Sequence, residues 1–287
     1  MDKAAQHPEE GVSQVAENHR AVLEYDGTEY AGFQVQSTQS TIQGQVEAAL
    51  QRITGVAVRI AGAGRTDTGV HARGQVISFR CEWRHEIYEL QRALNAVLPG
   101  DIAIRSLQLA NEAFHARFSA IRRTYIYSIY QDPIRSPLTE RYAMHIAQEL
   151  DVAAMQIAAD GLLGDHDFAA FGQDPRGAES TMRRVYCACW NCGNRSLWPQ
   201  LAEQHASLQF EVTADAFLRG MVRRIVGNLV RVGLGDLSAE QFAEVQDSRS
   251  LAHSAPPAPA RGLNLWHVQY QDENGLVSGP FDERRSR

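Results

Sequence analysis

The chain of 287 residues has almost no lysine, few cysteines and no long apolar run. Lys3 is its only lysine, so 27 of its 28 basic side chains are arginines. No stretch of about 18 apolar residues occurs, so we expect no membrane-spanning helix and no membrane partner. The polar, acidic N-terminus lacks the basic and apolar regions of a signal peptide, which predicts a cytoplasmic protein.

Four cysteines are too few for a disulfide framework in a chain of this length, so a reducing compartment is expected. Three of them, Cys187, Cys189 and Cys192, lie close together. With His205 as a fourth ligand they would suit zinc, but structural zinc sites usually show cleaner paired spacing. We therefore favour reduced surface cysteines and expect no metal.

The formal net charge is −6 at pH 7, which argues against a nucleic-acid partner, because basic side chains drive phosphate binding. The distribution of the arginines weakens this argument. They cluster at residues 117–123, at 183–184 and at 219–231. Arginine suits bidentate phosphate contacts and stacking on bases, and a net-acidic protein can still present a basic cleft.

Strand-like and helix-like patterns follow one another in two similar sets. We predict strands at residues 21–26, 56–62, 75–81, 102–109, 122–131, 183–190, 207–214 and 262–271. We predict helices at residues 41–53, with Thr41 as N-cap, and at 87–98, 151–164 and 217–233. This series predicts an α+β fold of two related, ferredoxin-like sheet-and-helix halves with mainly antiparallel sheets, joined across a central cleft. The expected divisions are an acidic tail at 1–18, halves at 19–110 and 111–271, and a flexible tail at 272–287.

The glycine-rich segment Ala63-Gly64-Arg65-Thr66-Asp67-Thr68-Gly69-Val70-His71-Ala72 carries the strongest functional signal. It is not a phosphate-cradling loop. It lacks a Gly-Lys-Ser/Thr ending, and Asp67 stands where a dinucleotide fingerprint starting at Gly62 requires its last glycine. From the residues alone, a structural turn in which Asp67 caps a backbone amide remains the simplest interpretation.

This segment resembles the active-site motif of the tRNA pseudouridine synthase A family. Further motifs follow in the family's order: Tyr25-Asp26-Gly27, Leu98-Pro99-Gly100-Asp101, Phe114-His115-Ala116-Arg117-Phe118-Ser119-Ala120, Met221-Val222-Arg223 and Gly262-Leu263. The resemblance covers about residues 20–271. It implies an isomerase that converts uridine to pseudouridine at positions 38 to 40 of the tRNA anticodon stem-loop, as a homodimer without metal or organic cofactor.

The resemblance also implies roles for three catalytic residues. Asp67 is the catalytic carboxylate beside the ribose, and Arg223 pairs with it, which favours the charged form. Tyr125 stacks on the uracil, although its strand-face neighbour Tyr127 is an equal candidate from the pattern alone. The sequence leaves open whether Asp67 attacks the ribose C1′, attacks the base at C6 or assists elimination.

Three more arginines are candidate RNA-binding residues. Arg65 resembles the arginine that family members place against the RNA, where it would support a flipped nucleotide; a phosphate contact is the rival role. Arg219 and Arg231 recur with Arg223 at multiples of four along the predicted helix, which suits either a solvated face or, beside an acidic loop, the lining of a cleft.

The sequence departs from the family pattern at Thr68, at Arg219-Gly220 and in a cysteine-containing insertion near residues 187–205. His71 and His115 are expected to be structural or RNA-contacting. Two functions of other classes compete with the synthase. A non-catalytic RNA-binding module has no reason to keep Asp67 in a basic cleft. A glycoside hydrolase would need a second carboxylate as partner of Asp67, and none is evident.

Overall fold

The computed structural model describes residues 16–173, 180–192, 206–271 and 277–278. Most of both predicted tails and residues 193–205 of the cysteine-containing insertion lie outside these ranges. None of the helices in the described ranges is long and apolar enough to cross a bilayer.

Six elements come from the first 109 residues; the helix boundaries lie within one residue of the prediction, whereas three of the four strands begin four residues away from their predicted start. They are β1 (Glu17–Tyr25), α1 (Ile42–Thr54), β2 (Ile60–Gly62), β3 (His71–Cys81), α2 (Ile87–Val97) and β4 (Ile102–Leu109). Thr41 is the N-cap of α1, as predicted, and its side chain accepts a hydrogen bond from the Gly44 N–H. Glu86 and Glu89 form a capping box that starts α2.

The rest of the chain supplies a longer series. Its elements are β5 (Ala120–Gln131), β6 (Met144–Ile146), α3 (Val152–Asp160), β7 (Gly164–Asp167), β8 (Met182–Cys192), β9 (Ala206–Ala214), α5 (Met221–Gly233), α6 (Ala239–Asp247), β10 (Leu263–Gln271) and β11 (Val277–Ser278). Two short 3₁₀ turns, η1 (Leu251–His253) and η2 (Ala260–Gly262), precede β10. Helix α3 contacts α5 and α6, and α5 also contacts α6.

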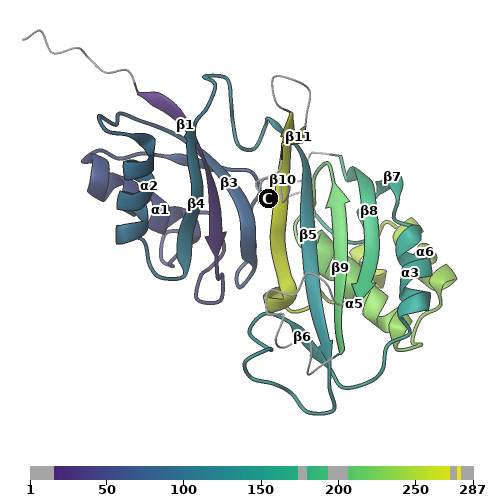
Figure 1. Ribbon diagram of the computed structural model, residues 1–287. Coiled ribbons are helices and arrows are strands. Elements are labelled where there is room, and N and C mark those ends of the chain that lie inside the picture. Colours follow the sequence, from purple (N-terminus) through teal and green to yellow (C-terminus); the bar gives the residue numbers. More distant parts are fainter. Residues whose placement is uncertain (1–15, 174–179, 193–205, 272–276, 279–287) are drawn as a thin grey trace, which may run out of the picture.

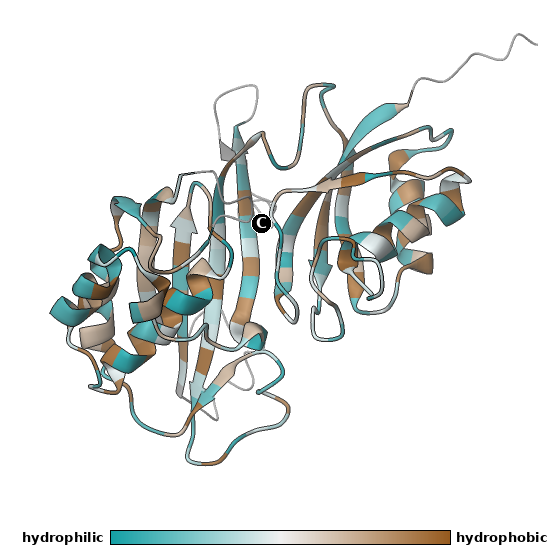
Figure 2. Ribbon diagram, turned by 180° about the vertical axis from the view of Figure 1, so that it is seen from behind, coloured by the Kyte–Doolittle hydropathy of each residue, from teal (hydrophilic) through white to brown (hydrophobic). Residues whose placement is uncertain are grey.

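These strands form one sheet of eleven strands in the described part of the chain. Eight of them follow the order β4-β1-β3-β10-β5-β9-β8-β7, while β2 pairs with β3, β6 with β5 and β11 with β10. The pairs are antiparallel except β3 with β10 and β5 with β6, so the expected α+β fold with a mainly antiparallel sheet is confirmed. The helices lie at the two outer ends of the sheet, and β3, β10 and β5 run through the middle (Figure 1; Figure 2).

The strands of the two sets meet at a short parallel contact. Strands β3 and β10 pair only at Asn264 with His71 and at Leu265 with Ala72. The Asn264 side chain strengthens this joint, because its Oδ1 accepts a hydrogen bond from the Arg73 N–H at 2.9 Å. On its other edge β10 pairs with β5 over most of its length. The short contact therefore places the loop before β3 beside β10 and β5.

One helix boundary differs from the prediction in a way that affects the site. The helix predicted from Phe217 begins at Met221, because Gly220 adopts a left-handed conformation with φ of 74°. Arg219 therefore precedes the helix and forms an isolated antiparallel β-bridge with Gln173. The predicted helical spacing of the arginines, at multiples of four, applies only to Arg223 and Arg231. The prediction also missed β6, β7, α6 and β11, and extended the helix at 151–164 past its end at Asp160.

Candidate active site

The loop that carries Asp67 connects β2 to β3 and packs on the segment that follows β1. The Phe33 N–H donates to the Thr66 carbonyl at 3.0 Å, and the Gly69 N–H donates to the Tyr30 carbonyl at 3.3 Å. Gly32 allows this close approach: its φ is +93°, and a Cβ there would lie 2.7 Å from the Thr66 carbonyl oxygen. The segment around Gly32 and the Asp67 loop are thus held together by close backbone packing and hydrogen bonds.

Buried hydrogen bonds fix the inner side of the same loop. The Thr66 hydroxyl lies 2.8 Å from the Tyr25 hydroxyl, and both side chains are buried. The Gln75 side chain donates to the Gly64 carbonyl at 2.8 Å. The backbone is therefore held on both sides of Arg65, while the Arg65 side chain itself is exposed.

Asp67 lies between two arginines. Its Oδ1 is 3.9 Å from Arg219 Nε, and its Oδ2 is 3.7 Å from Arg223 Nη1. The Arg223 side chain is only 19% exposed and is fixed by its Nε, which donates to the Ala258 carbonyl at 2.6 Å. The Arg219 side chain is 76% exposed. One cation is therefore preset beside the carboxylate, and the other is free to turn toward a ligand.

Tyr125 belongs to β5 and lies next to the Asp67 loop. Its side chain is buried and packs edge-to-face on Phe217 with ring centroids 5.0 Å apart, and a Cβ on Gly64 would lie 3.7 Å from its hydroxyl. Burial is the main cause that raises the pKa of Tyr125 well above its usual value, so its hydroxyl stays protonated. Tyr127 is instead a core residue whose hydroxyl donates to the Pro259 carbonyl. The structure thus distinguishes the environments of the two tyrosines, which the sequence pattern alone could not do.

The remaining predicted arginines form no ion pair with the carboxylate in the described residues. Among the ion pairs of the described residues, only Arg219 and Arg223 reach Asp67. Arg231 lies two turns further along α5, about 12 Å from Arg223 along the helix axis, and is partly buried. Arg65 and Thr68 are exposed on the loop itself.

Arg123 holds the loop to its surroundings, a role that the sequence did not indicate. Its guanidinium donates to four backbone carbonyls: Ala63 at 3.1 Å, Arg117 at 2.8 Å, Ala120 at 3.1 Å and Asp215 at 2.7 Å. Burial lowers the pKa of Arg123. Ala63 starts the Asp67 loop and Asp215 lies four residues before Arg219. One side chain therefore fixes both segments that meet at the carboxylate.

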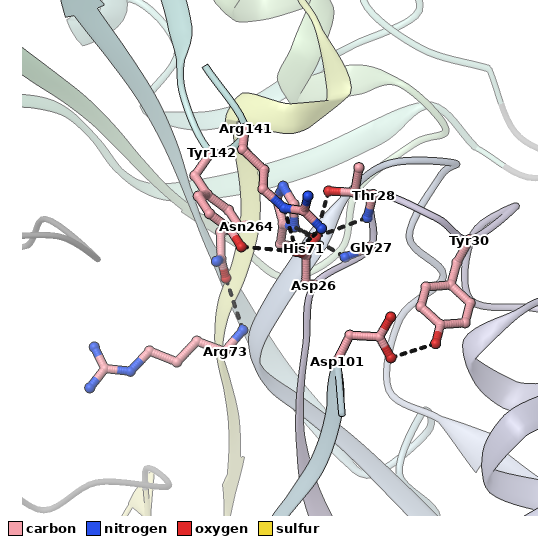
Figure 3. A network of polar contacts seen from close by, with 10 residues as sticks. All are labelled: Asp26, Gly27, Thr28, Tyr30, His71, Arg73, Asp101, Arg141, Tyr142 and Asn264. Atoms are coloured by element: carbon pink, nitrogen blue, oxygen red, sulfur yellow. Dashed lines mark hydrogen bonds and ion pairs between the residues drawn. The ribbon is translucent and has the colours of Figure 1, made fainter. Parts of the chain in front are cut away.

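A second polar cluster supports the loop near the end of β1 (Figure 3). The Asp26 carboxylate accepts hydrogen bonds from the Thr28 hydroxyl at 2.5 Å, and from Arg141 Nε and the Tyr142 hydroxyl, both at 2.9 Å. The buried His71 Nδ1 lies 3.1 Å from Asp26 Oδ1 and 3.1 Å from the Gly27 nitrogen. Burial lowers the pKa of His71, and its Nδ1 accepts a hydrogen bond from the Gly27 N–H.

This cluster borders a cavity of about 370 Å³ that also contacts Arg73, Asp101 and Asn264. Asp26 joins the end of β1 to the segment around Arg141 and Tyr142, which leads into β6. Because His71 begins β3 directly after the Asp67 loop, these contacts fix the far end of that loop. The cluster therefore holds the C-terminal end of the loop, whereas Arg123 holds its N-terminal end.

The cysteines provide no metal site in the described residues. No group of three or more histidine, cysteine or carboxylate side chains with metal-binding geometry occurs there. Cys187 and Cys189 lie on β8 with their sulfurs 3.6 Å apart. The side chain of Cys192 and the whole of His205 lie outside the described parts. The alternative of a zinc site with four ligands, Cys187, Cys189, Cys192 and His205, therefore also lies outside them.

Comparison with known proteins decides the family. The family model described as tRNA pseudouridine synthase matches residues 21–119 and 158–271. The chain belongs to this family, and is therefore an isomerase. It is 42% identical over 256 residues to the tRNA pseudouridine synthase A of Roseiflexus castenholzii, covering 89% of this chain and 92% of that protein. It is 43% identical over 253 residues to that of Chloroflexus aurantiacus, covering 87% of each.

A third relative, the tRNA pseudouridine synthase A of Brevibacillus brevis, is 39% identical over 251 residues, covering 88% of this chain and 98% of that protein. Among solved structures, the archaeal box H/ACA Nop10-Cbf5 complex covers 74% of this chain and 44% of its own, with a TM-score of 0.33 and 11% identity. That likeness is too weak to support any argument about the site.

The Asp26 cluster makes the stability of the fold depend on pH. Burial raises the pKa of Asp26, but hydrogen bonds from Thr28, Tyr142 and Arg141 outweigh it and lower the pKa from 3.8 to about 2. Asp26 therefore stabilises the fold above about pH 4, and this contribution is lost as the pH falls toward 2. We expect it to be about 2 kcal/mol. Asp26→Asn should lower the free energy of urea unfolding at pH 6 by this amount and remove the corresponding part of the acid dependence.

The control for this experiment is Asp165→Asn, because the Asp165 carboxylate is 61% exposed and pairs with Arg184 only at 3.5 Å. It should change the unfolding free energy by less than about 1 kcal/mol. Equal acid dependence in Asp26→Asn and the wild type would show that the network does not hold Asp26 ionised.

Arg123 yields a second prediction, about both stability and turnover. Arg123→Lys keeps the charge, but an ammonium cannot reach four carbonyls in the guanidinium's geometry. We expect a loss on the order of 3 kcal/mol in unfolding free energy, because the hydrogen bonds to partly buried carbonyls are lost. Turnover should also fall at temperatures where the protein is still folded.

Arg122→Lys is the matched control, since its guanidinium lies 3.9 Å from the Tyr186 ring centroid and contributes no such hydrogen bonds in the described structure. Denaturant titration and single-turnover kinetics on the same samples measure both effects. A stability loss confined to Arg122→Lys would contradict the role given to Arg123.

Proposed function

We propose that this protein converts uridine to pseudouridine at positions 38 to 40 of the tRNA anticodon stem-loop, with Asp67 as the nucleophile. The observation that carries the proposal is the position of Asp67: a carboxylate that is 34% exposed, between two arginines, on a loop that is fixed at both ends and lies next to a buried tyrosine. Family membership supplies the reaction, and the relatives' names supply the RNA.

The reaction needs no co-reactant, because it is an isomerisation. The bond between ribose C1′ and uracil N1 breaks, the base turns, and a bond forms between C1′ and C5; N1 ends with a proton and C5 loses one. Asp67 offers an ionised oxygen to the electron-poor centre of this sequence. Arg223, fixed by the Ala258 carbonyl, stabilises that charge without having to reorganise.

Tyr125 suits the task of holding the base. Its neutral hydroxyl can donate a hydrogen bond but cannot compete with Asp67 as a charged group. Its ring is held edge-on by Phe217, so a uracil that enters beside Asp67 meets a surface of fixed orientation. None of these steps gives a task to a metal or an organic cofactor, and we propose that the enzyme uses neither.

The uridine must leave the stacked stem to reach this site. Arg65 projects from the same loop as Asp67 and is exposed, so we assign to it the support of the flipped nucleotide. Arg219 and Arg231 are assigned to phosphate contacts along the RNA path. These arginines supply local positive charge in a protein whose net charge is −6.

We further propose that residues 19–110 and 111–271 act as two domains, that the protein is a homodimer, and that it acts in the cytoplasm. The domain proposal is supported by the short β3–β10 contact between the two sets of strands. The homodimer proposal comes from the family resemblance, and sedimentation of the purified protein tests it directly. The half-buried thiols of Cys187 and Cys189 suit a reducing compartment.

The two competing functions have weaker support. A glycoside hydrolase requires a second carboxyl group at a matched distance from the first. The charged partners of Asp67 in the described residues are arginines instead. A non-catalytic RNA-binding module would gain nothing from a carboxylate that repels phosphate at the centre of its arginines.

Asp67→Asn tests the catalytic assignment. The amide keeps the shape of the side chain but removes the negative charge, so turnover should fall by at least a thousandfold. Affinity for tRNA should stay within a few-fold of the wild type. Pseudouridine is mapped in unmodified tRNA after single-turnover incubation in EDTA, which tests the absence of a metal requirement in the same reaction. Turnover within about tenfold of the wild type would refute the role of Asp67.

The salt dependence of tRNA binding tests the arginine path. Affinity should fall steeply as salt rises despite the net negative charge, because local phosphate neutralisation releases counterions. Arg231→Ala should weaken binding and reduce the slope of log affinity against log salt by about one unit, without changing which uridine is modified. Arg65→Ala should instead impair turnover more than binding.

The control is Arg59→Ala, because Arg59 is 83% exposed and pairs with Glu47 at 2.8 Å on α1, away from the site. Its salt slope should match that of the wild type. If Arg231→Ala shows that same unchanged slope, Arg231 lies outside the RNA path.

A further inference from the structure

Phe118 is an apolar side chain that the fold leaves in water. It is 76% exposed, and it is the only phenylalanine in the described residues that is exposed. It belongs to the segment between β4 and β5, on which the mechanism above places no task. An exposed ring of this size forgoes the stabilisation that burial would give, so its position requires a reason.

The exposure does not come from a loose backbone. The Ala116 N–H donates to Ser78 Oγ at 3.0 Å, and the Tyr270 hydroxyl donates to the Ala116 carbonyl at 2.6 Å. The Ser119 N–H donates to the His115 carbonyl at 2.9 Å, and His115 Nδ1 accepts from the Arg117 N–H at 3.1 Å. The segment is therefore fixed on both sides of Phe118 while the ring points outward.

The ring has neighbours that match the chemistry of base binding. Its centroid lies 4.4 Å from that of the His115 ring, and the Arg117 guanidinium lies 5.8 Å from the Phe118 centroid. The His115 ring packs against the Phe118 ring at an interplanar angle of 36°, and the Arg117 guanidinium lies over the Phe118 ring. An exposed aromatic ring beside an arginine is the combination that stacks on unpaired bases and contacts the adjoining phosphate.

The position relative to the catalytic loop is fixed by Arg123. The same nitrogen, Arg123 Nη2, donates to the Arg117 carbonyl at 2.8 Å and to the Ala63 carbonyl at 3.1 Å. The backbone next to Phe118 therefore lies directly beside the first residue of the loop that carries Arg65 and Asp67. This shared contact links the segment of Phe118 to the loop of Asp67 through one guanidinium.

We propose that Phe118, supported by His115 and flanked by Arg117, is a stacking platform for an RNA base adjacent to the flipped uridine. The inference rests on the proposed function and deepens it, because it assigns a second nucleotide contact to the site. Stacking accepts any base, so this platform suits an enzyme that acts at neighbouring positions in different sequences. It supplies binding energy outside the reacting nucleotide, which offsets the cost of unstacking the uridine.

Three substitutions at one position test the platform. Phe118→Ala removes the ring, Phe118→Leu keeps an apolar side chain that cannot stack, and Phe118→Trp keeps a stacking ring. Affinity for an unmodified anticodon stem-loop should fall roughly five- to a hundredfold in the alanine and leucine variants and return to near wild type in the tryptophan variant. Ile157→Ala, which removes another exposed apolar side chain (65% exposed) on α3, is the control and should leave affinity unchanged.

A fluorescent base locates the contact. 2-Aminopurine is placed, one position at a time, on either side of the target uridine, and its emission is followed as protein is added. Wild type and Phe118→Trp should quench it at one position, and Phe118→Ala should not. Quenching that is the same in all variants, or a leucine variant that binds like the wild type, would overturn the stacking role.

A second copy of the chain is the competing occupant of this surface. Sedimentation of each variant separates the cases: a lower oligomeric state in Phe118→Ala would make the ring an interface residue and overturn the proposal. The failure of the proposed function is distinguishable, because in that case the wild-type protein would form no pseudouridine in tRNA whatever residue stands at position 118.

Discussion

The half-buried guanidinium of Arg123 is the interaction on which the site depends. A charge removed from water is costly unless its hydrogen-bonding groups are satisfied, and here four backbone carbonyls satisfy them. Those carbonyls come from segments that are distant in sequence: the start of the Asp67 loop, the segment before β5, and the turn that leads to Arg219. One guanidinium therefore links these segments to one another.

The Asp26 cluster complements this support at the other end of the loop. It joins the end of β1 to β3 and to the segment before β6, where the two sets of strands meet at a short parallel contact. Both supports leave the carboxylate of Asp67 without a short hydrogen bond, since its arginines stand 3.7 and 3.9 Å away. The loop backbone is fixed, and the reactive oxygens remain available. This division suits a nucleophile better than a structural capping residue.

The sequence predicts the long, periodic elements and misses features that depend on tertiary context. Helix α1 begins after Thr41 as predicted, because its apolar spacing and its cap agree. Helix α5 begins four residues later than predicted. The apolar spacing of the sequence extends across Gly220, but the left-handed backbone of this glycine cannot belong to the helix. For the site, motif resemblance named Asp67, Arg223 and Tyr125, and in the structure Arg223 Nη1 lies 3.7 Å from Asp67 Oδ2. It gave no sign of Arg123, because a cluster of arginines predicts phosphate contacts, and a sequence does not show which carbonyls a folded chain leaves unpaired.

Exposure divides the residues of the site into two functional groups. Tyr125 and Arg223 are 7% and 19% exposed and are fixed by the protein before any ligand arrives, as electrostatic stabilisation of a reaction requires. Arg219 and Phe118 are each 76% exposed, so an RNA ligand can order them on binding. Ordering a flexible arginine consumes part of the binding energy, whereas a ring on a fixed backbone loses little entropy. In this site the aromatic side chain is therefore better suited than the exposed arginines to hold a base in position while the neighbouring uridine turns.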